Sequence, residues 1–233
     1  MRAGVAWLAA FALAACGGGG SADAGVDAGP RPTNLLSLPQ VQRNSGHVLT
    51  TPRVVTVTFP GDPLAPELQT FSGRLGQSLY WADVTSEYGV GSLVAAGQVV
   101  VNAPAPTAID DVALKTFIQG HQGTDWPAAT SSTVYLLYFP SSSTVTENGL
   151  TGCVDFAGYH GALADASGNF QAAYAVVVRC GPDATALDAL TSTAAHELVE
   201  AVTDPNLDAF FGLDPGHGTW TAAAALDHVR CTA

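Results

Sequence analysis

The stretch STVYLLYFP, residues 132–140, constrains the fold more than any other part of the chain. It is short, rich in β-branched and aromatic residues, and apolar without interruption from Val134 to Phe139. A strand with one solvated face would alternate apolar and polar residues, so this run predicts a strand that is buried on both faces.

Strand-like and helix-like segments alternate along the chain. The expected strands span residues 52–60, 92–102, 132–140 and 171–180, and the expected helices span residues 65–89, 107–122 and 183–204. Residues 153–163 are expected to form an edge strand and a loop, and the unpatterned residues 140–152 a surface loop. This alternation predicts an α/β (α+β) fold with a mixed, mostly parallel sheet.

The composition is that of a folded domain. The 233 residues are 47% hydrophobic and 12% charged, which supplies a sizeable core and too little charge for a disordered chain. The formal net charge is −12 and Lys115 is the single lysine. This charge argues against a nucleic-acid-binding surface.

The beginning of the chain is predicted to be a lipoprotein signal peptide, residues 1–15. MRAGVAWLAAFALAAC contains an arginine, an apolar run and small residues before Cys16. Residues 13–16 resemble the bacterial lipobox, which implies lipidation of Cys16. Residues 16–43 are expected to form the lipidated start and a flexible tether rich in glycine, alanine, aspartate and proline, followed by a globular domain over residues 44–233. We expect a lipid anchor on the bacterial cell envelope, at the outer membrane or cell surface, without a membrane span.

Three cysteines lie in the expected domain, Cys153, Cys180 and Cys231. In an oxidising compartment, two of the three are expected to form a disulfide. Cys153–Cys180 is the first expectation, because both residues lie near the ends of strand-like segments. Cys180–Cys231 is the alternative, and either pairing leaves one thiol.

The sequence TAAHELVEAVTDP, residues 193–205, contains the pattern H-E-x-x-E. His196 and Glu200 are four residues apart, so a helix presents them on one side, opposite a leucine stripe, with Glu197 between the two faces. Pro205 predicts that the helix ends at Asp204 or one residue earlier. A solvated helix face would carry charges in the same way, so helical geometry leaves both interpretations open.

The motif differs by one residue from the H-E-x-x-H of zinc metalloproteases. Zinc accepts imidazole nitrogen and carboxylate oxygen, and a catalytic zinc site has three protein ligands and an open position. His196 and Glu200 are therefore candidate ligands, and Glu197 is the candidate general base. A third ligand is sought among five further residues, of which the first two are weighed most: Asp204, Asp227, His228, His217 and His160.

The segments SGHVLTTPRVVTVTFPG, CVDFAGYH, YAVVV and AAHELVEAVTDP resemble the secreted proteins related to plant exordium, also called phosphate-induced protein 1, and their bacterial and fungal relatives. The resemblance implies a single extracytoplasmic α/β domain similar to zincin peptidases, with an active-site helix that carries His196, Glu197 and Glu200. The family commonly has E-I-x-D-x-C after a tryptophan. After Trp220, Asp227 stands for the aspartate, and Ala224 occupies the glutamate position.

Two functions are compatible with these observations. The first is a zinc-dependent hydrolase, peptidase-like, that acts on a peptide or envelope substrate with Glu197 as the general base. The second is a non-enzymatic envelope lipoprotein with a zincin-like fold and a structural or lost metal site, which the altered C-terminal element favours.

Overall fold

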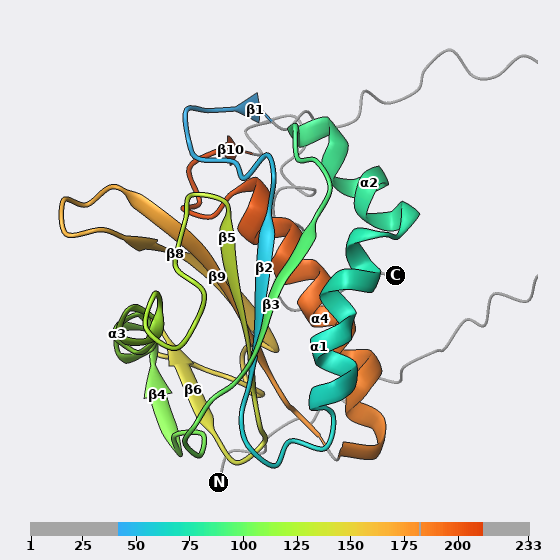
Figure 1. The fold of residues 1–233 in the computed structure, drawn as a ribbon, viewed down its shortest axis with the longest axis vertical. Coiled ribbons are helices and arrows are strands. Elements are labelled where there is room, and N and C mark those ends of the chain that lie inside the picture. Colours follow the sequence, from blue (N-terminus) through green and yellow to red (C-terminus); the bar gives the residue numbers. More distant parts are fainter. Residues whose placement is uncertain (1–41, 182, 212–233) are drawn as a thin grey trace, which may run out of the picture. The chain divides into compact units, whose positions relative to one another are not determined.

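The computed structural model describes residues 42–181 and 183–211, all within one compact unit. A five-stranded sheet with the order β3-β2-β5-β9-β8 forms its centre (Figure 1). In that order the strands are Val94–Val100, Arg53–Thr58, Thr133–Phe139, Phe170–Val178 and Gly158–Ala164. The first four are parallel and β8 is antiparallel to β9, which confirms a mixed, mostly parallel sheet.

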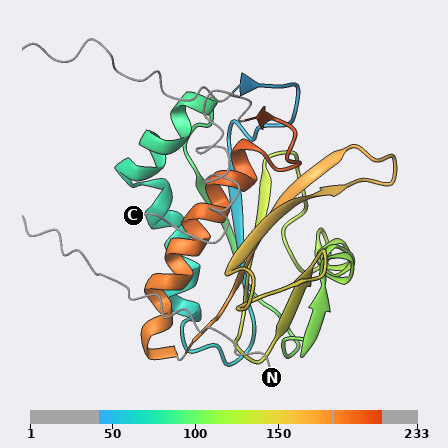
Figure 2. The same cartoon turned by 180° about the vertical axis from the view of Figure 1, so that it is seen from behind.

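Helices cover both faces of this sheet (Figures 1 and 2). The helices α1 (Ala65–Gly76), α2 (Leu79–Thr85) and α4 (Asp183–Thr203) lie on one face, and α3 (Asp111–His121) lies on the other. Every residue of β5 is buried, as the continuous apolar run predicts. Successive residues of β5 alternate between the two cores, because side chains of a strand point to opposite faces.

The remaining elements are short. β4 (Ala108–Asp110), β6 (Thr144–Glu147) and β7 (Leu150–Thr151) form a small sheet, β1 (Gln42–Arg43) pairs with β10 (Phe210–Phe211), and a 3₁₀ turn spans Ser86–Tyr88.

The prediction of a plain surface loop over residues 140–152 was wrong, because β6 and β7 form a hairpin there. Asn148 and Gly149 both have positive φ angles, 50° and 83°. This Asn-Gly pair is the turn sequence that favours a two-residue hairpin.

The single helix predicted over residues 65–89 is divided into α1 and α2. Ser78 begins α2, since its hydroxyl oxygen accepts a hydrogen bond from the Trp81 N–H at 3.2 Å. After this break Leu79 is 83% exposed, whereas Trp81 enters the core. The interruption therefore follows from a serine N-cap inside an otherwise helical pattern.

The start of α3 and the end of α4 also follow from local chemistry. α3 begins after Asp110, whose carboxylate accepts a hydrogen bond from Ala113 N–H at 2.8 Å, rather than at residue 107. α4 ends at Thr203, within the limit that Pro205 sets.

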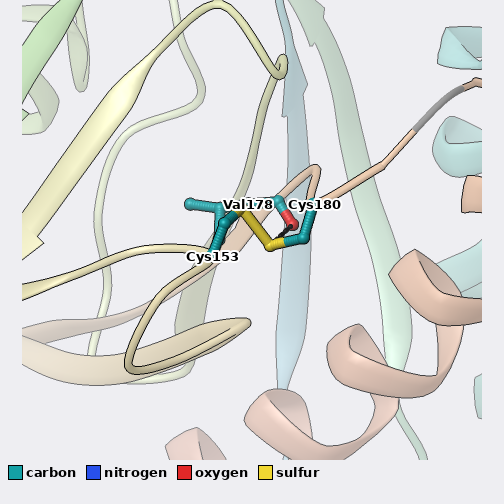
Figure 3. Close-up of a disulfide and its surroundings, with 3 residues drawn as sticks. All are labelled: Cys153, Val178 and Cys180. Carbon is teal, nitrogen blue, oxygen red and sulfur yellow. Dashed lines mark hydrogen bonds between the residues drawn. A yellow bond between two sulfur atoms is a disulfide. The ribbon is translucent and has the colours of Figure 1, made fainter. Parts of the chain in front are cut away.

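Cys153 and Cys180 form a disulfide, which confirms the first expected pairing (Figure 3). Cys180 lies two residues after the end of β9, and its sulfur lies 3.6 Å from the carbonyl oxygen of Val178. Cys153 belongs to the loop that leads into β8. The bond therefore ties the entry of β8 to the connection between β9 and α4.

The predicted signal peptide, Cys16 and the tether up to residue 41 lie outside the described residues, as does Cys231. Within residues 42–181 and 183–211, no helix is long and apolar enough to cross a membrane.

Removing the disulfide should destabilise the domain. The bond closes a loop of 27 residues, so the double variant Cys153→Ala/Cys180→Ala is expected to lose about 3 kcal/mol of unfolding free energy, because its unfolded chain gains conformational freedom. Urea unfolding followed by tryptophan fluorescence measures this loss. The oxidised and the reduced wild-type protein serve as controls. If the unfolding free energy of the double variant lies within about 0.5 kcal/mol of that of the oxidised wild type, the disulfide does not stabilise the fold.

Candidate metal centre

The helix α4 packs closely against β8, and a glycine permits the contact. A methyl group at Gly158 would lie 2.6 Å from Thr193 Cγ2 and 2.8 Å from Glu197 Oε1. Both distances are shorter than any ordinary contact, so only a residue without a side chain fits there. Because Gly158 has no side chain, the Glu197 side chain can lie against the backbone of the strand.

The register of β8 directs His160 toward the helix. His160 pairs with Ala175 of β9, and Ala175 belongs to the core that α4 covers. Directly paired residues of antiparallel strands lie on the same face of a sheet. His160 therefore faces α4, whereas the neighbouring Tyr159 belongs to the core on the other face.

His160 meets the two glutamates of the H-E-x-x-E pattern. Its Nδ1 lies 3.2 Å from Glu200 Oε2 and 3.5 Å from Glu197 Oε2. Its Nε2 lies 3.3 Å from the main-chain oxygen of Asp204. The imidazole is thus surrounded by oxygen atoms on both of its nitrogen sides.

His160, Glu197 and Glu200 together form a possible metal-binding group. Each offers one ligand atom, and these three atoms lie within 4.8 Å of one another. His196 adjoins it, with Nε2 at 3.4 Å from Glu200 Oε1. We call these four side chains the His/Glu cluster.

Burial divides the cluster into an inner and an outer part. The side chains of Glu197 and His160 are 1% and 4% exposed. Those of His196 and Glu200 are 23% and 29% exposed. His196 and Glu200 share one side of the helix, as predicted, whereas Glu197 is more buried than its position between the two helix faces suggested, because β8 covers it.

The cluster is strongly coupled electrostatically. Burial lowers the pKa of His160, but hydrogen bonding and the negative charges of Glu197 and Glu200 outweigh burial and raise this pKa to about 9. Burial, together with the negative charge of Glu200, raises the pKa of Glu197 although the neighbouring His160 and His196 act to lower it. In this structure the carboxylates therefore stabilise a positive charge between them.

Asp204, one of the two favoured third ligands, has another task. Its Oδ1 accepts hydrogen bonds from the N–H groups of Asp208 and Ala209, both at 2.7 Å. These bonds close the turn that follows α4. The Asp204 carboxylate is not part of the ligand group, whereas His160, a candidate of lower weight, is part of it.

The remaining candidates Asp227, His217 and His228 lie outside the described residues. The sequence did name His160, and the alternation in GYHGAL separates it from Tyr159 and Leu163. That alternation gives two faces without saying which one meets the helix, since this depends on the pairing with β9.

The donors of the cluster fit a zinc-type ion. Imidazole nitrogen and carboxylate oxygen are ligands that zinc accepts. Glu197 Oε2 is buried, and His160 Nδ1 at 3.5 Å is its ion-pair partner. A buried carboxylate is costly unless a positive charge pairs with it, and a protonated His160 or a bound metal cation would each do so.

No protein-family model, no curated protein and no solved structure matches this chain. The functional assignment therefore depends on the geometry of the His/Glu cluster and on the sequence.

Substituting Gly158 should disturb both stability and the cluster. Gly158→Ala is expected to lower the unfolding free energy by about 1–3 kcal/mol, because the added methyl group overlaps Thr193 and Glu197. Gly120→Ala in α3 is the matched control, since a methyl group there meets nothing within 4 Å and alanine favours a helix by about 0.5–1 kcal/mol. Urea unfolding of both variants checks the pair, and equal stabilities would refute the close packing.

Proposed function

We propose that this protein is a zinc-dependent hydrolase in which His160, His196 and Glu200 hold the metal ion and Glu197 is the general base. The observation that carries the proposal is the approach of His160 to the two glutamates of the helix. It adds an imidazole from a separate strand to the two ligands that the helix spacing supplies. Three ligands of this kind, two histidines and one glutamate, are a set that catalytic zinc sites use.

Zinc, when bound, would supply Lewis-acid chemistry and lower the pKa of a water molecule in the site. The chain itself supplies the proton acceptor. Glu197 Oε2 lies beside the proposed ligands, 3.5 Å from His160 Nδ1, where it can take a proton and return it to a leaving group. Gly158 leaves the space beside the strand that the Glu197 carboxylate occupies.

The proposed setting is the outside of the cytoplasm, with a lipid at Cys16 as the anchor on a bacterial envelope membrane. The Cys153–Cys180 disulfide supports an oxidising compartment. The proposed substrate is a peptide, because the H-E pattern resembles that of metallopeptidases. The resemblance to the exordium-related proteins points to the same zincin-like arrangement.

A structural metal site is the second candidate, and burial favours it. Glu197 and His160 are almost completely enclosed, and structural zinc sites are closed whereas catalytic sites keep an open position. In that case zinc would stabilise the fold and the chain would have no hydrolytic activity.

Zinc binding is the first test of the proposal. The purified full chain should bind about one equivalent of zinc, measured by competition with a chromogenic chelator and by elemental analysis. His160→Ala should weaken binding by about 100-fold or more, because it removes a ligand that the helix cannot replace.

The matched control is His121→Ala. His121 is also a histidine with a carboxylate partner, Asp125 at 2.8 Å, but it lies on α3, away from the cluster. Its loss should leave zinc affinity unchanged. If wild type and His160→Ala bind zinc with equal affinity, His160 is not a zinc ligand, and the proposal loses the observation on which it depends.

Hydrolysis is tested separately with Glu197→Gln. This variant should retain zinc and cleave a broad peptide library about 100- to 10,000-fold more slowly, because it lacks the proton acceptor. Glu67→Gln, at an exposed position of α1, is the control and should cleave at the wild-type rate.

If the wild-type protein binds zinc, gains thermal stability from it and cleaves no peptide, then the zinc ion has a structural role and the proposal of a hydrolase is wrong. If Glu197→Gln cleaves as fast as wild type, Glu197 is not the general base.

A further inference from the structure

The strand β3 forms one edge of the central sheet. On its inner side it pairs with β2 in parallel orientation, and on its outer side no strand among residues 42–181 and 183–211 pairs with it (Figure 1). The unpaired N–H and C=O groups of such an edge can pair with a further strand. The outer side of β3 is therefore a candidate interaction surface.

The hydrogen bonds to β2 identify the backbone groups of β3 that face outward. Val101 N–H donates to the carbonyl oxygen of Thr58 at 2.9 Å, and Thr58 is the direct partner of Val100. In a parallel ladder this pattern means that the backbone groups of Val99 and Val101 point to β2. Because these groups alternate in direction along a strand, those of Gln98 and Val100 point to the free edge.

The apolar side chains of β3 remain in contact with water. None of its seven residues is buried, whereas every residue of β5 is buried. Val94 and Val100 are 45% and 55% exposed. Removing apolar surface from water is favourable, so cover by a further strand would stabilise this edge.

The edge carries no charge, although the chain is strongly acidic. Residues 88–109 contain no aspartate, glutamate, lysine, arginine or histidine, and the formal net charge of the chain is −12. Natural proteins commonly protect edge strands from pairing by charged side chains or proline, and β3 contains neither. The sequence of β3 therefore does not oppose pairing.

A β-bulge limits the part of β3 that is available. The pairing with β2 skips Ala96 and is regular from Gly97 to Val100. A bulge disturbs an edge locally, so the regular part is the surface that can pair. The other edge strand of the sheet, β8, differs from β3, because it faces the His/Glu cluster and the carbonyl oxygen of Ala164 at its end accepts from Gln119 Nε2 at 3.0 Å.

We propose that β3 pairs with β3 of a second copy of this chain, antiparallel and across a two-fold axis, so that the two central sheets join into one. In such a contact each strand meets an identical strand, and the outward backbone groups of Gln98 and Val100 supply both donors and acceptors. The proposal is independent of the proposed metal centre, which lies at the opposite edge strand.

Charge favours a second copy as the occupant of this edge. Two chains with a net charge of −12 repel each other. Like charges directly opposite each other destabilise a pair of strands. The uncharged edge lets two acidic chains approach without such a pair, and an antiparallel strand pair needs no complementary charge on a different partner.

Sedimentation velocity of the full chain tests the proposal. The concentration should run from about 1 µM to 1 mM, the range of weak association. We expect a reversible equilibrium between monomer and dimer. Added salt should strengthen the dimer, because it screens the repulsion between the two acidic chains.

Val100→Pro should raise the dissociation constant of the dimer about tenfold or more, because each copy loses a hydrogen bond across the interface. An edge strand tolerates proline where its N–H faces solvent, and the bonds between β3 and β2 do not use the N–H of Val100. Circular dichroism checks the fold. Val100→Ala is the matched control, since it keeps the N–H and should stay within about threefold of the wild type.

A chain that stays monomeric at about 1 mM, a dimer that Val100→Pro leaves intact, or equal weakening by Val100→Pro and Val100→Ala would each overturn the proposal. If Val100→Pro does not fold, Gln98→Glu decides. This change adds a negative charge to an exposed residue of the edge and should weaken the dimer at low salt, with recovery at high salt. An unchanged dissociation constant of Gln98→Glu would then overturn the proposal.

Discussion

The contact between α4 and β8 is the constraint on which the candidate site depends. Gly158 lets the helix approach the strand so closely that Glu197 is packed against its backbone. The same approach brings His160 of β8 within 3.2 Å of Glu200. A larger residue at position 158 would separate the strand from the helix, and the His/Glu cluster would not form. The disulfide supports this arrangement, because it joins the segments that lead into both elements.

Much of the fold was predictable because buried segments have a recognisable pattern of apolar residues in the sequence. The uninterrupted apolar run of β5 required cover on both faces, and both faces are covered. Features that depend on one or two residues were missed. Ser78 ends one helix pattern and starts another, and Asn148-Gly149 makes a hairpin inside a segment without periodicity. Local capping and turn chemistry override averaged patterns at such points.

The site was predictable only where its residues share one element. Helical spacing alone puts His196 and Glu200 on one side of α4. His160 reaches them through the pairing of β8 with β9, and a shift of that register by one residue would turn it to the opposite face. Asp204 is a carboxylate at the point where the chain turns after the helix, and its Oδ1 accepts hydrogen bonds from two backbone N–H groups of that turn. Local hydrogen bonding therefore competes with ligand duty for a residue at a helix end.

The most direct measurement of the central claim is X-ray absorption at the zinc edge of the zinc-loaded chain and of its His160→Ala variant. We expect two imidazole ligands and carboxylate oxygen at about 2.0–2.2 Å from zinc in the wild type, and one imidazole fewer in the variant. A sulfur ligand in the wild type, or an unchanged imidazole contribution in the variant, would contradict the proposed metal site.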